Sequence, residues 1–256
     1  MSLPNTDGFL PSVLELSGGS GSDFTNGTDF IPGVNTVIAG VPSQEKGIRP
    51  ARALPYELNV QASVDASSST VTLTFDNTGR ATAVFHVRST NTADLARTYT
   101  VEPGKQLSDS WNVGSSYNLS VYGPNGFFRS FAGSVGGAAL DLSSRYDTEN
   151  GGTLKWKITN LTGAQAQVTV KDAYTGDANT HLLQRSGTFE DELSVGRFYG
   201  WYDVIVTVAG DPSFNCELAG HIETGEDSFT DPVLGGLVTR QAEVKPVDEV
   251  PAKVDA

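Results

Sequence analysis

Three histidines are the residues of this 256-residue sequence best suited to acid–base chemistry, and their surroundings favour structural roles. A catalytic imidazole needs a partner group placed beside it. His86 stands between Phe85 and Val87 in an alternating stretch, so its side chain is predicted to turn away from the core. The matching position in a later repeat of the sequence is Thr169, which cannot replace an imidazole. His181 falls in a polar stretch that predicts a loop.

His221 and the single cysteine complete the candidates for chemistry. His221 precedes two carboxylates, Glu223 and Glu226, but without the His-x-x-x-His spacing of a metal site, so no metal or other cofactor is predicted. One thiol, Cys216, can form neither an internal disulfide nor a thiolate cluster. Its place on an alternating apolar face predicts a buried small hydrophobe. Arg129 matches it in the repeat, which indicates either a different register there or a position at the rim.

No sequence motif supplies a catalytic constellation. The sequence has no Gly-x-Ser-x-Gly elbow and no Walker loop, and "DNTG" lacks the spaced acidic ligands of an EF-hand. We therefore predict no catalytic residue. The aromatic turn "YGPNGFF" is the remaining candidate, because adjacent strand residues face opposite ways and at least one ring must point outward. Tyr122, with Phe127 or Phe128, is accordingly predicted to form a docking or lipid-facing surface.

The charge balance excludes several classes of partner. Acidic residues outnumber basic ones by 30 to 17, which gives a formal charge of −13. This sign opposes binding to nucleic-acid phosphates and to anionic membrane surfaces, but not to zwitterionic lipid. No apolar run approaches the roughly 20 residues that a membrane-spanning helix needs. The N-terminus has neither the basic start nor the apolar core of a signal peptide.

The elements that would position these residues read as all-β. Gly and Pro are frequent, and strands alternate with period two in "TVTLTFDN" and again in "TLKWKITN". These stretches belong to an internal repeat of about 85 residues. The alternation predicts a core in each copy. The predicted core residues are Leu73, Phe75, Phe85, Trp156, Ile158 and Val168.

The repeat predicts two tandem small β-sandwich domains. Residues 1–52 read as an irregular linker or the end of an upstream catalytic domain. The first copy is predicted over residues 53–136 and the second over 137–231. Residues 232–256 are charged and contain no aromatic residue, which is typical of a disordered tail.

Several long stretches resemble a known family. "EKGIRPARALPYELNV" (Glu45 to Val60), "YTVEPGKQLSDSW", "YNLSVYGPNGFFRSFAG" and "YDVIVTVAGDPSFNCELAGHIETGEDSFTDP" closely resemble the C-terminal region of bacterial phosphatidylcholine-preferring phospholipases C. The resemblance covers about residues 40–235. In this family of secreted hemolytic and non-hemolytic enzymes, two C-terminal domains follow a large phosphoesterase domain. The whole enzyme releases phosphocholine from phosphatidylcholine and, in some members, from sphingomyelin.

The resemblance implies a non-catalytic accessory role in lipid catabolism outside the cytoplasm. The implied partners are the phosphoesterase domain, in cis or in trans, and zwitterionic phospholipid. The family's nucleophile and metal motifs match no residues of this sequence, so the chain alone is expected to be inactive. The alternative function is a free-standing module that binds carbohydrate or a cell surface, because β-sandwiches serve many such purposes.

Overall fold

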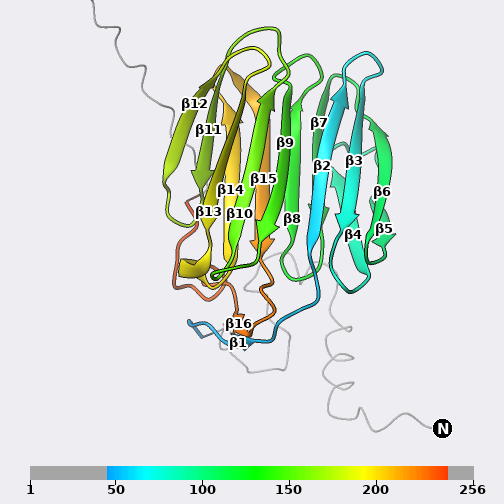
Figure 1. Ribbon diagram of the computed structural model, residues 1–256. Helices are drawn as coiled ribbons and strands as arrows, with labels where there is room; N and C mark the ends of the chain where they lie inside the picture. Colours follow the sequence, from blue (N-terminus) through cyan, green and yellow to red (C-terminus); the bar gives the residue numbers. More distant parts are fainter. Residues whose placement is uncertain (1–44, 242–256) are drawn as a thin grey trace, which may run out of the picture. The chain divides into compact units, whose positions relative to one another are not determined.

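The computed structural model describes residues 45–241, and those from Lys46 onward belong to one compact unit built almost entirely of β-strands (Figure 1). Residues 1–44 and 242–256, which contain most of the predicted linker and tail, lie outside the described residues. Within the described range, no helix is long and apolar enough to cross a membrane.

Within residues 45–241, seven strands of the first copy correspond one to one with seven strands of the second. The first set is β2 (Leu58–Asp65), β3 (Thr70–Asn77), β4 (Ala83–Ser89), β5 (Arg97–Val101), β6 (Lys105–Asn112), β7 (Ser116–Tyr122) and β8 (Phe128–Ser134). The second set is β9 (Leu140–Asp147), β10 (Thr153–Asn160), β11 (Ala166–Asp172), β12 (Ala178–Leu183), β13 (Thr188–Ser194), β14 (Trp201–Val208) and β15 (Asp211–His221). One short 3-10 helix, η1 (Gly196–Phe198), precedes β14.

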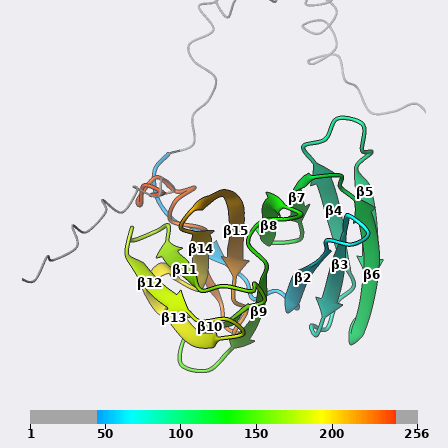
Figure 2. The same cartoon turned by 90° about the horizontal axis from the view of Figure 1, so that it is seen from above.

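Each copy is a sandwich of two antiparallel layers, as the sequence predicted. In the first copy the three-stranded sheet β2-β3-β6 faces the strands β5-β4-β7-β8 (Figure 2). In the second copy β9-β10-β13 faces β12-β11-β14-β15 in the same way. Period-two alternation places one row of apolar side chains between the layers of each sandwich, where they are removed from water.

The two sandwiches share a continuous sheet, a feature that the repeat pattern alone does not predict. β8 pairs antiparallel with β15, which joins the two larger layers into one sheet of eight strands. Ser130 lies opposite Glu217, and the pairs on either side are Arg129 with Leu218 and Phe131 with Cys216. Because residues 129 and 131 correspond to 216 and 218 in the repeat, the pairing is quasi-twofold: equivalent edges meet each other.

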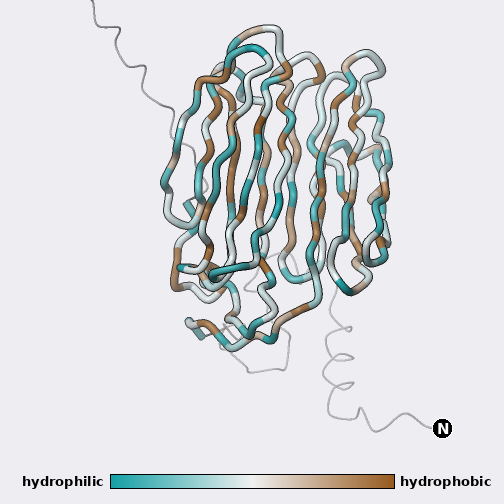
Figure 3. Tube along the Cα trace, viewed as in Figure 1, coloured by the Kyte–Doolittle hydropathy of each residue, from teal (hydrophilic) through white to brown (hydrophobic). Residues whose placement is uncertain are grey.

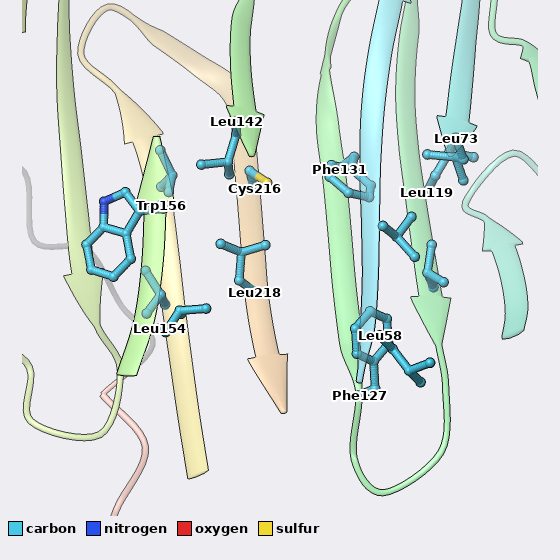
Figure 4. Packing of buried hydrophobic residues seen from close by; sticks show 14 of the residues in the cluster. Leu58, Leu73, Leu119, Phe127, Phe131, Leu142, Leu154, Trp156, Cys216 and Leu218 are labelled. Carbon is cyan, nitrogen blue, oxygen red and sulfur yellow. The ribbon is translucent and has the colours of Figure 1, made fainter. Parts of the chain in front are cut away.

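The core follows the alternation in the sequence (Figure 3). Trp156 is 7% exposed, and the other five predicted core residues (Leu73, Phe75, Phe85, Ile158 and Val168) are fully buried. Phe75 contacts Phe85 at 5.2 Å and stacks on Tyr99 at 4.5 Å between ring centroids. Figure 4 shows buried apolar side chains of both copies, among them Leu73 and Leu119 of the first and Leu154 and Trp156 of the second.

A repeated asparagine holds the turn that crosses from the smaller layer to the larger one, between β3 and β4 in the first copy and between β10 and β11 in the second. The buried side chain of Asn77 donates to the carbonyl oxygens of Ala81 and Val101, at 2.9 and 2.8 Å. Asn160 does the same in the second copy, to Ala164 at 2.8 Å and to a carbonyl that ends β12. Buried polar groups need such partners, so both turns are fixed by side-chain contacts as well as by backbone pairing.

Described residues on both sides of the predicted domain limits, before residue 53 and after residue 231, take part in the fold. β1 (Pro50–Ala51) pairs antiparallel with β16 (Ser228–Phe229), so the end of the predicted linker is part of the fold. Beyond Asp231, the backbone N–H of Gln241 donates to the carbonyl oxygen of Ala173 at 2.7 Å. The described part of the predicted tail therefore packs on the second copy, because its backbone and side chains find partners there.

Candidate docking surface and buried polar clusters

The three aromatic residues predicted as a surface are divided between the core and the outside. Phe127 is only 6% exposed and packs edge-on against Phe85, with 5.6 Å between ring centroids. Phe127 therefore belongs to the core and adds nothing to a docking surface. Tyr122, 43% exposed, pairs with the half-buried Phe128 across β7 and β8, and their rings lie 5.2 Å apart. Arg88 covers the Tyr122 ring at 5.7 Å.

Arg129 is fully buried at the junction of the two copies, although its position in the repeat suggested the rim or a different register. One guanidinium nitrogen donates to the carbonyl oxygens of Phe128 and Ala219, at 2.8 and 3.0 Å. The other donates to the hydroxyl oxygens of Tyr146 and Tyr202, at 2.8 and 3.1 Å. Carbonyl and phenol oxygens take the place of the carboxylate that usually accompanies a buried arginine.

The two tyrosine hydroxyls form a directed chain. Tyr146 donates to the carbonyl oxygen of Leu58 at 2.9 Å, so Tyr202 donates to the Tyr146 oxygen, 2.8 Å away. Burial raises the pKa of the Tyr202 phenol well above its ordinary value, which keeps this donor protonated. The Phe127 ring lies 4.3 Å from the Arg129 guanidinium carbon and offers the cation a π face. The cluster thus joins strands of both copies in one hydrogen-bonded network.

The smaller layers also touch at this junction, between β2 and β9. The side chain of Asn59 donates to the carbonyl oxygen of Ser144 at 2.6 Å, and the Ser144 hydroxyl donates back to the Asn59 side chain at 3.0 Å. Further along the same strands a small apolar cavity of about 30 Å³ remains. It is lined by Ala62, Val64, Tyr117, Phe131, Leu142 and Cys216, among others (Figure 4). A space of this size is comparable to one water molecule and is too small for a lipid chain.

Cys216 and His86 lie where the sequence placed them. Cys216 is 4% exposed, and burial raises the pKa of its thiol to about 12, so it is not a reactive thiolate. His86 is exposed and lies 3.2 Å from the hydroxyl of Thr98. His181 differs from expectation: it belongs to β12 instead of a loop, and its ring stacks on Phe189 at 4.1 Å. Polar residues occur on both faces of this strand because β12 lies at the edge of its sheet, where even side chains on the inner face reach water.

His221 lies in a cluster with the residue types of a hydrolase triad, Ser228, His221 and Glu223. The His221 and Glu223 side chains are each 7% exposed, with Nδ1 3.0 Å from the carboxylate. However, Nε2 faces the carbonyl oxygen of Tyr199 at 2.9 Å, and the Ser228 hydroxyl donates to the same carbonyl at 2.6 Å. Nε2 also lies 3.4 Å from the Ser228 hydroxyl oxygen, but the serine proton is donated to the backbone carbonyl and not to the imidazole, which assigns this cluster a structural role.

Glu223 connects segments that are far apart in the sequence. Its carboxylate accepts hydrogen bonds from the side chain of Asn125, at 2.6 Å, and from the backbone N–H of Leu54, at 2.8 Å. Asn125 belongs to the turn after β7, and Leu54 follows β1. Glu223, which follows the last long strand of the second copy, therefore binds both the segment after β1 and the β7–β8 turn of the first copy. Nothing in the local sequence around these three residues indicates that they meet.

An arginine near the end of the described chain holds two acidic side chains of the large sheet. Arg240 forms ion pairs with Asp203 and Glu217, which lie on β14 and β15. Burial raises the pKa of both carboxyls, and the Arg240 charge opposes that rise. Among residues 45–241, no group of three His, Cys, Asp or Glu side chains is arranged to hold a metal ion.

A comparison with known protein families shows which family the chain belongs to. The family described as "Bacterial phospholipase C, C-terminal domain" matches twice, over residues 50–134 and 140–221. The chain belongs to this family. Its two matches coincide with the two sets of seven strands, so each copy of the family domain is one sandwich.

The curated proteins that this chain resembles are about three times as long as the region it matches. A non-hemolytic phospholipase C of Burkholderia pseudomallei is 38% identical over 89% of this chain and 34% of its own length. The corresponding Pseudomonas aeruginosa enzyme is 37% identical over 77% of the chain and 30% of its length. A hemolytic phospholipase C of that organism is 32% identical over 76% and 30%. This phospholipase C C-terminal region thus spans about a third of the relatives it matches. A solved structure of red sea bream transglutaminase shares 12% identity over 67% of this chain and 32% of its own, with a TM-score of 0.22.

Proposed function

We propose that this chain is the non-catalytic accessory region of a secreted phospholipase C that hydrolyses phosphatidylcholine. In this function it supports or orients the phosphoesterase part, which precedes it in the longer proteins, at the lipid substrate. The observation that carries the proposal is the double family match in a chain that spans about a third of its phospholipase relatives.

The polar clusters of the structure favour a supporting role over chemistry. Both terminal nitrogens of the Arg129 guanidinium donate to acceptors of the fold, while its buried Nε has no partner, and the His221 ring is fixed between Glu223 and a backbone carbonyl. These contacts hold segments of the two copies together. A rigid two-copy unit of this kind is suited to presenting a fixed surface to a neighbouring domain or to a lipid aggregate.

The test compares the full-length enzyme with a form that ends before residue 45. Hydrolysis is measured on phosphatidylcholine vesicles and on a soluble phosphocholine ester, and the melting temperature of each protein is recorded. We expect the shortened enzyme to lose at least about tenfold in activity on vesicles, because correct positioning at an interface is worth several factors of ten. Adding the separate two-copy unit should restore part of that loss. Equal activity and equal stability of the two forms would overturn the proposal.

A further inference from the structure

Four exposed apolar side chains lie on segments next to the short β1–β16 ribbon, close in sequence or by hydrogen bonding to the first described residues. Leu54 is 38% exposed, Tyr199 40%, Leu234 79% and Leu237 56%. We call these four residues the lead-in patch. Leu54 follows β1, the two other leucines follow β16, and the Tyr199 ring lies 5.0 Å from that of Phe229 in β16. The ribbon itself lies at the lower end of the view in Figure 1, and the hydrogen bond from Gly47 to Gly235 brings the segment of the two later leucines beside the incoming chain.

The ribbon that carries the lead-in patch is held firmly. Arg49 and Thr230 exchange hydrogen bonds, from the Arg49 N–H to the threonine hydroxyl at 3.0 Å and from the Thr230 N–H to the Arg49 carbonyl at 2.9 Å. The indole of Trp201 donates to the carbonyl of Phe229 at 2.8 Å. Gly47 donates to the carbonyl of Gly235 at 2.8 Å. A surface fixed in this way loses little conformational entropy when a partner covers it.

A polar hollow adjoins the patch. It has a volume of about 380 Å³ and is lined in part by Tyr199, His221, Glu226, Asp227 and Ser228. Both of its acidic side chains, Glu226 and Asp227, are exposed. An apolar cluster beside polar and charged groups is the usual composition of an interface between protein domains.

The attachment of the chain identifies the partner. Whatever precedes residue 45 is tethered at this end of the unit, and the relatives carry about two thirds of their length outside the matched region. Covalent attachment makes the contact intramolecular and so raises the effective concentration of the attached part, which favours even a modest apolar contact. We propose that the lead-in patch docks against the phosphoesterase part of the longer enzyme. This inference rests on the proposed function and names the surface it uses.

The experiment separates docking from tethering. In the full-length enzyme a specific protease site is inserted within residues 1–44, the chain is cut there, and the two parts are followed by size-exclusion chromatography. We expect the cut parts to co-migrate. Leu54→Ser combined with Leu237→Ser should make them separate, with a dissociation constant raised about 100-fold, because burying one leucine side chain in a contact is worth roughly a factor of ten or more. Both substitutions sit at exposed positions and should leave the fold intact.

The matched control is Leu95→Ser combined with Leu161→Ser. Leu95 is 85% exposed and Leu161 is 62% exposed. They belong to the β4–β5 and β10–β11 turns, at the end of the strands that faces away from the β1–β16 ribbon. This control should co-migrate like the parent. Separation of the parent parts, or identical behaviour of the two double variants, would overturn the docking inference. If the Leu54/Leu237 double variant separates the parts without changing phosphatidylcholine hydrolysis, the docking inference stands and the proposed function fails. If removing the two-copy unit lowers activity but the cut parts never associate, the proposed function stands and the docking inference fails.

Discussion

Arg129 of the first copy donates a hydrogen bond to the hydroxyl of Tyr202 in the second copy, over 3.1 Å, and both side chains are fully buried. The same guanidinium reaches the second copy through the carbonyl of Ala219 and the hydroxyl of Tyr146. An ion taken out of water is costly to bury, so these contacts are needed for the fold to tolerate it. Arg129 thereby makes the stability of each copy depend on the other.

We expect Arg129→Ala to lower the free energy of unfolding by about 3–5 kcal/mol, because it leaves buried hydroxyl and carbonyl groups without a donor and opens a cavity. Urea denaturation followed by tryptophan fluorescence measures the change. Arg88→Ala is the control, since Arg88 is exposed on the same sheet and should cost less than about 0.5 kcal/mol. Equal midpoints for the two variants would show that the network contributes nothing.

The sequence predicted the strands and the core well, because both follow from side-chain periodicity. Leu73 and Trp156 lie on alternating faces that only a half-buried strand explains, and both are buried. The pairing of the two copies leaves no such pattern in the sequence. It is formed by the backbone N–H and C=O groups on the edges of β8 and β15. Every residue except proline supplies both groups, whatever its side chain.

The candidate sites were harder to predict, for a related reason. Arg129 matches Cys216 in the repeat, and three of its four acceptors come from the other copy. Glu223 and Asn125 are 98 residues apart, and each alone is an ordinary polar residue in a turn. Phe127 and Phe128 were indistinguishable in sequence, and the register of the hairpin decides which one is buried. Long-range register is the information that one sequence lacks.

The shared sheet leads us to expect one cooperative unfolding transition for both copies. Leu73→Ala and Trp156→Ala should each lower the stability of that transition by about 2–5 kcal/mol, as large buried side chains do when removed. Differential scanning calorimetry tests this by comparing calorimetric and van't Hoff enthalpies, which agree for a two-state unit. Two resolved transitions, with each variant shifting only the one from its own copy, would instead indicate independent domains.

The Arg240 cluster should give a pH-dependent mutant. Burial raises the pKa of Asp203 and Glu217, so each carboxyl stabilises the fold below its ordinary pKa and loses that contribution as pH rises through the raised value. Arg240→Ala removes the cation that limits this rise. We therefore expect the variant to match the parent near about pH 4 and to be less stable by about 1 kcal/mol near about pH 7.

Unfolding free energies measured across this pH range provide the comparison. Carboxyls with a lowered pKa, such as Asp65 at about 2, lose stability on the acid side, but they are common to both proteins and cancel in the difference. Lys157→Ala is the control, because Lys157 and its partner Glu190 are more than half exposed and 3.7 Å apart. A difference that stays constant with pH would exclude titration of the Arg240 partners.

The outward pair Tyr122 and Phe128 has its own test in the full enzyme. Replacing both by Ser leaves Phe127 in the core, so the fold should survive. We expect activity to fall severalfold on soluble and vesicle substrates alike, because exposed apolar patches on such modules usually contact protein. Loss only on phosphatidylcholine vesicles would indicate lipid contact, and unchanged activity on both would remove this pair from the functional surface. Val84→Ser, at a similarly exposed position of the same sheet, is the control.

Glu223 should control how firmly the incoming chain is held. Glu223→Gln keeps the shape of the side chain but replaces one carboxylate oxygen by an NH₂ group, which cannot accept from Asn125, Leu54 and His221 together. Losing hydrogen bonds to a charged acceptor costs about 1–3 kcal/mol. Because β1 has only two residues, that loss should open the β1–β16 ribbon locally while the sandwiches stay folded.

Hydrogen exchange of the backbone amides of Arg49 and Leu54 measures this opening and should accelerate about tenfold or more in the Glu223→Gln variant. The control is Glu226→Gln, which changes an exposed carboxylate three residues away and should leave the exchange rates unchanged. Equal exchange in both variants would mean that backbone pairing alone holds the lead-in, and that the Glu223 contacts are incidental to it.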